Sequence, residues 1–149
     1  MKSSILVTSL VVLPLTLAAC GKSKVEQCNA LIDHAGKAQA AVNALNLDSD
    51  DPKVLQDGGA KVESAAKDFA TVELKDEKLV GFRNSYGEIL TGLSKIVSDL
   101  GAATAESKDE AKAEAAATKT KKLVEDANAL EKKESTLVDE INMYCSGTK

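Results

Sequence analysis

The longest regular hydrophobic pattern of the chain runs from residue 79 to residue 100. Its members are separated alternately by three and four residues: Leu79, Phe82, Tyr86, Ile89, Leu93, Ile96 and Leu100. This spacing keeps every member on one face of a helix and is typical of the seam along which helices pack in coiled-coil fashion. Asp76, just before the pattern, is the predicted N-cap. Because one helix cannot bury such a seam alone, the pattern predicts an assembly of helices.

Two segments before this helix also place apolar residues at helical spacing. The first predicts a helix from about Lys24 to Leu47. The second predicts a helix from Pro52 to about Val72, after a turn that supplies an N-cap and a proline at the first helical position. Gly58-Gly59 favours either a late start of this second helix or a close crossing with another one. The predicted inner faces hold Val25, Cys28, Leu31, Ile32, Ala35, Val42 and Leu45 in the first helix and Leu55, Val62, Ala65, Ala66, Phe69 and Val72 in the second.

A fourth helix is predicted from Ser107 to about Tyr144. Ser107-Lys108-Asp109-Glu110 fits a capping box, in which the serine hydroxyl and the glutamate carboxylate each accept from a free backbone amide. Glu134 interrupts the apolar seam and is interpreted as a boundary residue that reaches water, with a buried acid as the alternative. The seam otherwise holds Leu123, Ala127, Leu130, Leu137, Ile141 and Tyr144. The scarcity of proline, with two in 149 residues, also favours an all-α fold.

The first 19 residues have the parts of an export signal. Lys2 provides a positive start, a largely apolar run extends from Ile5 to Leu17, and Ala18-Ala19 are small residues of the kind that a signal peptidase requires. The apolar run is shorter than the ~20 residues of a transmembrane helix. We therefore expect residues 1–19 to direct export and then to be cleaved.

Leu17-Ala18-Ala19-Cys20 resembles the lipobox of bacterial lipoproteins. The resemblance implies cleavage before Cys20, lipid attachment at Cys20 and a lipidated tether over residues 20–24. An ordinary secretory signal followed by a chance cysteine is the alternative. Gly21 replaces the aspartate that retains many lipoproteins in the inner membrane, so the resemblance favours the periplasmic leaflet of the outer membrane over the inner membrane. The expected partner of this end of the chain is thus a lipid bilayer.

With Cys20 assigned to the lipid, Cys28 and Cys145 are the two remaining cysteines. An even pair in an exported protein predicts a disulfide, whereas two buried thiols or an intermolecular bridge are the alternatives. In an up-down arrangement of four helices, the start of the first helix and the end of the last lie at the same end. Three helices would separate the two cysteines beyond the ~7 Å that a disulfide spans between α carbons.

The predicted fold is therefore an all-α, antiparallel up-down four-helix bundle with coiled-coil-like packing, cross-linked by one disulfide. The bundle is expected to comprise residues 25–145, followed by a short tail at 146–149. The tether is too short to hold the disulfide end far from the membrane. Residues 100–122 are consequently predicted to form the distal tip, where the last helix has room to project beyond the others.

Charge and motifs exclude several classes of function. After the expected cleavage of the leader, which removes Lys2, the chain has 18 basic and 23 acidic residues and a net charge of −5. Nucleic acid is therefore not an expected partner. The sequence contains one histidine and no recognisable nucleophile, metal or phosphate motif, so no enzyme, cofactor or metal site is predicted. His34 and Met143 are weak candidates for haem ligands, by an architectural resemblance to four-helix periplasmic cytochromes.

The favoured function is a non-enzymatic, membrane-anchored lipoprotein that acts through contacts with an unknown envelope protein. The segment from Leu100 to Lys122 would carry the contact surface. One alternative is a module that binds a small apolar ligand or haem within the bundle. Another is a peptidoglycan tether through Lys149, as in the murein lipoprotein. An exposed helical seam is also compatible with self-association.

Overall fold

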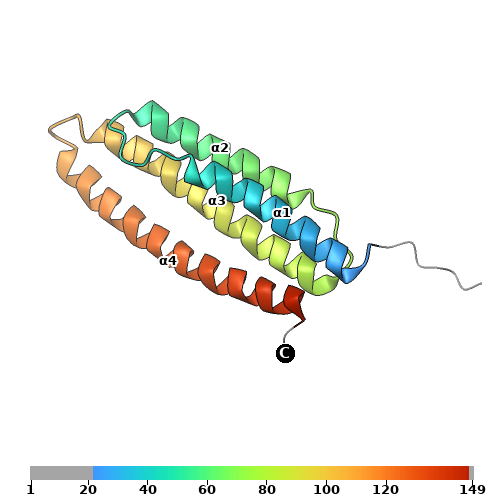
Figure 1. The fold of residues 1–149 in the computed structure, drawn as a ribbon. Coiled ribbons are helices and arrows are strands. Elements are labelled where there is room, and N and C mark those ends of the chain that lie inside the picture. Colours follow the sequence, from blue (N-terminus) through green and yellow to red (C-terminus); the bar gives the residue numbers. More distant parts are fainter. Residues whose placement is uncertain (1–21, 148–149) are drawn as a thin grey trace, which may run out of the picture.

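The computed structural model describes residues 22–147, and within this range helix is the only regular secondary structure, without strands. Four helices run alternately up and down along one axis (Figure 1). The predicted all-α, antiparallel four-helix bundle is therefore confirmed. The helices are α1 (Lys24–Asn43), α2 (Pro52–Ala70), α3 (Glu77–Glu106) and α4 (Ala113–Ser146). No helix in the described range has the length and apolar content needed to cross a membrane.

Side-chain caps explain where three of the helices begin. Asp76 caps α3 as predicted, and Asp51 caps α2 in the turn that was predicted to supply an N-cap. The Asp51 carboxylate accepts from the Lys53 amide, and that of Asp76 accepts from the amides of Lys78 and Leu79. α1 begins with a capping box that the sequence analysis missed, formed by Ser23 and Glu26. The same helix ends at Asn43 instead of the predicted Leu47.

The predicted start of α4 is wrong. Ser107 is the C-cap of α3, and its hydroxyl donates to the Thr104 carbonyl oxygen at 2.8 Å. Residues 107–112 form a turn, and α4 begins at Ala113 without a side-chain cap. The physical reason is that α3 continues through the alanine-rich segment after Gly101, where helix propensity is high, and therefore includes the residues up to Glu106.

The pairing of α2 with α3 is the most extensive in the bundle. Both glycines at issue, Gly58 and Gly59, lie inside α2, so the late-start alternative is wrong and the close crossing is correct. A Cβ atom on Gly59 would lie 2.8 Å from the Ser94 carbonyl oxygen and would clash with the Ser98 hydroxyl. The Ser94 hydroxyl donates to the Gly59 carbonyl oxygen at 2.8 Å, which ties the two backbones together in the interior.

The buried face of α3 changes along its length. Leu79, Phe82, Tyr86 and Ile89 are buried as predicted, whereas Leu93, Ile96 and Leu100 are only partly buried. In that half of the helix, the face toward α2 is buried instead. A straight α-helix drifts relative to a strict seven-residue repeat, and the close approach of α2 favours this adjacent face. The residues buried there are Leu90, Ser94, Val97 and Gly101.

α4 packs mainly along α3, contacts α1 over a short stretch and does not contact α2 within the described residues. The α3–α4 connection lies at the end of the bundle opposite the start of α1 (Figure 1). Ala103 and Ala116 are both buried, and Lys119 pairs with Glu106 at 3.7 Å. The first half of α4 therefore packs against the last turns of α3 and does not project alone beyond the other helices.

Candidate functional site: the disulfide-linked end of the bundle

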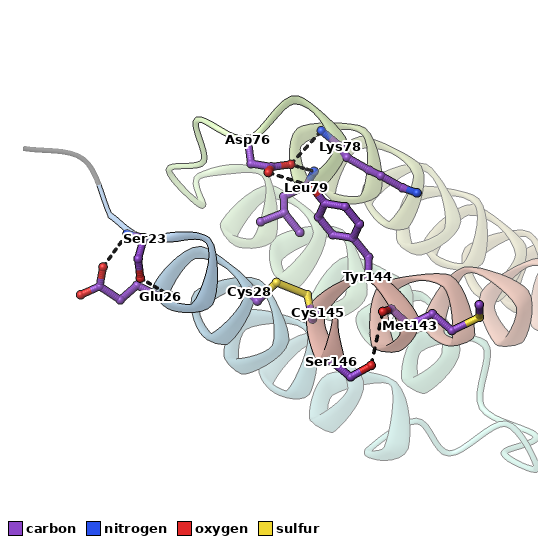
Figure 2. Close-up of a disulfide and its surroundings, with 10 residues drawn as sticks. All are labelled: Ser23, Glu26, Cys28, Asp76, Lys78, Leu79, Met143, Tyr144, Cys145 and Ser146. Carbon is purple, nitrogen blue, oxygen red and sulfur yellow. Dashed lines mark hydrogen bonds between the residues drawn. A yellow bond between two sulfur atoms is a disulfide. The ribbon is translucent and has the colours of Figure 1, made fainter. Parts of the chain in front are cut away.

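One end of the bundle joins the start of α1 to the end of α4 through a disulfide. Cys28 and Cys145 are bonded, with their α carbons 5.7 Å apart. The predicted intramolecular bridge is confirmed, and with it the placement of both cysteines at the same end (Figure 2). Because α1 and α4 contact each other so little, this bond is their principal connection.

A buried glutamine fastens α1 to the α2–α3 connection at the same end. The Gln27 side chain is 6% exposed, and its Oε1 atom accepts from the backbone amides of Lys75 at 2.6 Å and Asp76 at 3.0 Å. Its Nε2 atom donates to the Lys22 carbonyl oxygen at 2.9 Å. Both the oxygen and the nitrogen of this buried amide thus have hydrogen-bond partners. The sequence analysis missed Gln27, because nothing near it in the chain distinguishes it from an exposed glutamine.

Asp76 connects α3 to the end of α4. Its Oδ1 atom accepts from the amides of Lys78 and Leu79, both at 3.0 Å, and its Oδ2 atom accepts from the Tyr144 hydroxyl at 2.8 Å (Figure 2). The Leu79 amide, followed by the Tyr144 hydroxyl, stabilises the carboxylate and holds the pKa of Asp76 below its usual range. The same hydrogen bond raises the pKa of Tyr144.

The Tyr144 ring lies between cations and a second ring. The Nζ atom of Lys24 lies 3.6 Å from the ring centroid and that of Lys78 lies 4.9 Å from it. Phe82 meets the ring edge-on, with centroids 5.8 Å apart. Together with the disulfide and Gln27, these contacts join the start of α1, the α2–α3 connection, the start of α3 and the end of α4.

We expect Asp76 to contribute stability at neutral pH that is lost in acid. Its pKa is lower in the folded state than in the unfolded one, so the contribution is complete above the unfolded value of about 3.9 and disappears as the pH falls through the folded value. Asp76→Asn keeps an N-cap side chain but does not titrate. Urea unfolding of both proteins between neutral and acidic pH should show a steeper acid loss for the native chain; equal pH profiles would contradict the role of the carboxylate.

A shallow apolar groove opens beside the disulfide, between α1 and α4. Val25 and Ile32 of α1 and Met143 of α4 line it together with both cysteines. These three side chains are 64%, 44% and 59% exposed, respectively. We call them the disulfide-end patch. Exposed large apolar side chains usually occur singly, so the grouping of three of them beside the disulfide distinguishes this end of the bundle.

The structure does not bring the two candidate haem ligands together. His34 lines a groove between α1 and α2, beside Ala65 and Phe69. Met143 lines the groove on the other side of α1, against α4. A haem bound within the bundle requires both ligands to face one cavity, and these two face different ones. The described residues also contain no group of histidine, cysteine, aspartate and glutamate arranged to hold a metal ion.

Glu134 belongs to a polar cluster in the middle of the bundle. Its Oε1 atom accepts from the Tyr86 hydroxyl at 3.1 Å, and Oε1 of Gln39 lies 3.3 Å from the same hydroxyl. Burial, and next the Glu134 charge, raise the pKa of Tyr86 well above its usual value. Glu134 is half-buried, so the predicted boundary position is correct, and its carboxylate has a second role in holding α4 to α3.

Two of the predicted positions lie outside the described residues, namely Cys20 with the leader before it and Lys149 at the end of the chain. Comparisons with protein-family models, curated proteins and solved structures give no match to this chain. The candidate site is therefore defined by its own geometry: a rigid, cross-linked helix end with an exposed apolar patch, four residues after Cys20 in the sequence.

Proposed function

We propose that this protein is a lipoprotein anchored through acylated Cys20 in the periplasmic leaflet of the outer membrane, and that it acts without catalysis as a contact module. The observation that carries the proposal is the lipobox placed directly before α1, with Gly21–Ser23 as the only residues between Cys20 and the first helix. An extended chain spans ~3.5 Å per residue, so Lys24 would lie within about 14 Å of the lipid attachment point.

The cross-linked end suits a short anchor. When a linker of a few residues joins the lipid to the first helix, any force on the far end of the bundle acts on that helix. At that end, the Cys28–Cys145 bond and the Gln27 and Asp76 hydrogen bonds connect α1 to the rest of the bundle. These contacts support a rigid body that presents its opposite end to the periplasm.

The opposite end supplies the proposed partner surface. It consists of the α1–α2 connection and the α3–α4 connection, residues 44–51 and 107–112 (Figure 1). Leu47 and Val54 are exposed there, next to acidic residues of the first connection. Within the predicted contact segment from Leu100 to Lys122, Ala103 and Ala116 are buried, so the accessible part is the connection and its flanking turns. An exposed apolar pair with charged surroundings is typical of a protein contact surface.

Site-specific photocross-linking in living cells tests the proposal. A photoreactive amino acid is placed at Glu110 in the α3–α4 connection and, as a matched control, at exposed Lys61 in the middle of α2. We expect one envelope protein to be captured from position 110 and not from position 61. Capture should also require Cys20, because Cys20→Ala releases the module from its membrane.

Other outcomes would point elsewhere. Equal capture from both positions, or none, would contradict a contact surface at the tip. Peptidoglycan fragments on Lys149 would favour the tether instead. Mass spectrometry of the mature N-terminus tests the anchor separately, since a diacylglyceryl group on Cys20 is expected whichever partner is found.

A further inference from the structure

The exposed apolar side chains of the bundle are distributed unevenly. Among the described residues, seven large hydrophobic side chains are exposed, and three of them form the disulfide-end patch. Val138, another of the seven, precedes Asn142 and Cys145 by four and seven residues and so shares a face of α4 with these groove residues. The largest grouping of exposed apolar groups thus lies at the end that the chain attaches to Cys20.

A narrow stripe of α1 that runs through the patch carries no charge, although Glu26 and Asp33 are exposed next to it. Val25, Asn29, Ile32, Gly36 and Asn43 follow at spacings of four, three, four and seven residues, so they share one face of the helix. All five are exposed. Exposed helix faces normally carry charged residues that favour water, and this one carries none from the first turn of α1 to the last.

We infer that the disulfide-end patch inserts into the interfacial layer of the bilayer that holds the Cys20 lipid, so that the bundle leans on the membrane along its α1–α4 side. This inference rests on the proposed lipid anchor. Val25 is five residues from Cys20, within about 17 Å along an extended chain, so the bilayer is the surface that the anchor keeps at high effective concentration next to the patch. A second copy or another protein has to compete with it.

The geometry of insertion follows from the helix. Val25 and Ile32 are seven residues apart on α1, which separates them by about 10 Å along the helix axis. Interfacial side chains reach ~5–10 Å into the headgroup and acyl boundary, so both insert only if the bundle tilts toward this side. An upright bundle would submerge Val25 and leave Ile32 in water. Ile32 therefore reports the tilt, and Met143 reports the contribution of α4.

The chain contains no tryptophan, so a single introduced tryptophan reports its surroundings without background. The test uses the full lipidated protein with Ile32→Trp or Met143→Trp, reconstituted in vesicles of phosphatidylethanolamine and phosphatidylglycerol with or without brominated acyl chains. Leu47→Trp is the matched control, because Leu47 is similarly exposed and lies at the opposite end. We expect brominated lipid to remove about half of the emission at positions 32 and 143, as for a side chain at the acyl boundary, and to leave position 47 unchanged.

The contrary results are distinct. Vesicle-bound protein whose emission at positions 32 and 143 is quenched no more than at position 47 would overturn the inference and leave the anchor intact. A blue shift without quenching by brominated lipid would also overturn it, because a second copy or another protein would then cover the patch. Protein that fails to sediment with vesicles and lacks the lipid on Cys20 would overturn both the anchor and the inference. Circular dichroism and a non-reducing gel verify that each variant retains its helices and its disulfide.

Discussion

Loss of the Cys28–Cys145 bond is expected to lower the free energy of unfolding by about 4–5 kcal/mol. The bridge joins residues separated by 117 positions and so closes nearly the whole bundle into one loop. In the chain-entropy account, the stabilisation grows with the logarithm of loop length, which places this loop near the upper end of the usual range. Single domains are stable by only ~5–15 kcal/mol, so the loss would be a large share of the total.

Urea unfolding of the double variant Cys28→Ser/Cys145→Ser measures the effect. The double variant is measured in a Cys20→Ser background, and Cys20→Ser alone is the matched control, so that neither protein is lipidated and the two differ only at the bridge. The loss should exceed that of any single hydrogen bond at this end, each worth ~1 kcal/mol. A double variant within about 1 kcal/mol of the control would show that the Gln27 and Asp76 contacts already hold α1 and α4 in place.

The number, order and direction of the helices could be predicted because the relevant sequence signals lie within each helix or involve a single pair of cysteines. Apolar spacing identifies each helix from its own residues, and Asp51 and Asp76 cap helices through amides two or three positions away. The cysteine pair then distinguishes an up-down bundle of four helices from one of three. Each step needs only residues that are near in sequence or few in number.

The start of α4 could not be predicted in the same way, because two helices compete for one motif. Ser107 with Glu110 has the spacing of a capping box, which would cap a helix that begins there. Its hydroxyl donates to the Thr104 carbonyl oxygen instead, as part of the end of α3. The choice depends on where α3 stops. The alanine-rich residues after Gly101 continue α3 to Glu106, so Ser107 closes this helix and is not available to cap the next one.

The candidate site was predicted only as far as its disulfide. Gln27 binds amides 48 and 49 positions away, and the Tyr144 hydroxyl binds Asp76 across 68 positions. Sequence spacing carries no signal for such pairs, because the same residue types are common on exposed helix surfaces. The apolar patch was missed for a related reason: Val25 was assigned to the inner face of α1, and only the tertiary arrangement shows that it is exposed.

The close crossing of α2 and α3 gives the second large prediction. Gly→Ala substitutions inside a helix usually stabilise it by up to ~1 kcal/mol, because alanine has the higher helix propensity. Gly59 and Gly101 should show the opposite sign. A Cβ atom on Gly59 would lie 2.8 Å from the Ser94 carbonyl oxygen, and one on Gly101 would lie 2.7 Å from the Pro52 carbonyl oxygen. Both obstacles are backbone atoms, so relief requires the helices to move apart.

We therefore expect Gly59→Ala and Gly101→Ala each to destabilise the bundle by about 1–3 kcal/mol, the range for overpacked interiors. Gly87→Ala, in the same helix as Gly101 but with no atom within 4 Å of its added Cβ, should be neutral or stabilising. Urea unfolding of the three variants measures the sign directly. If all three were stabilised alike, helix propensity alone would govern these positions and the close crossing would be wrong. If Gly59→Ala and Gly101→Ala lower the free energy of unfolding while Gly87→Ala does not, Gly59 and Gly101 are required for the close crossing of α2 and α3. The same crossing then explains why the buried face of α3 shifts away from its heptad seam.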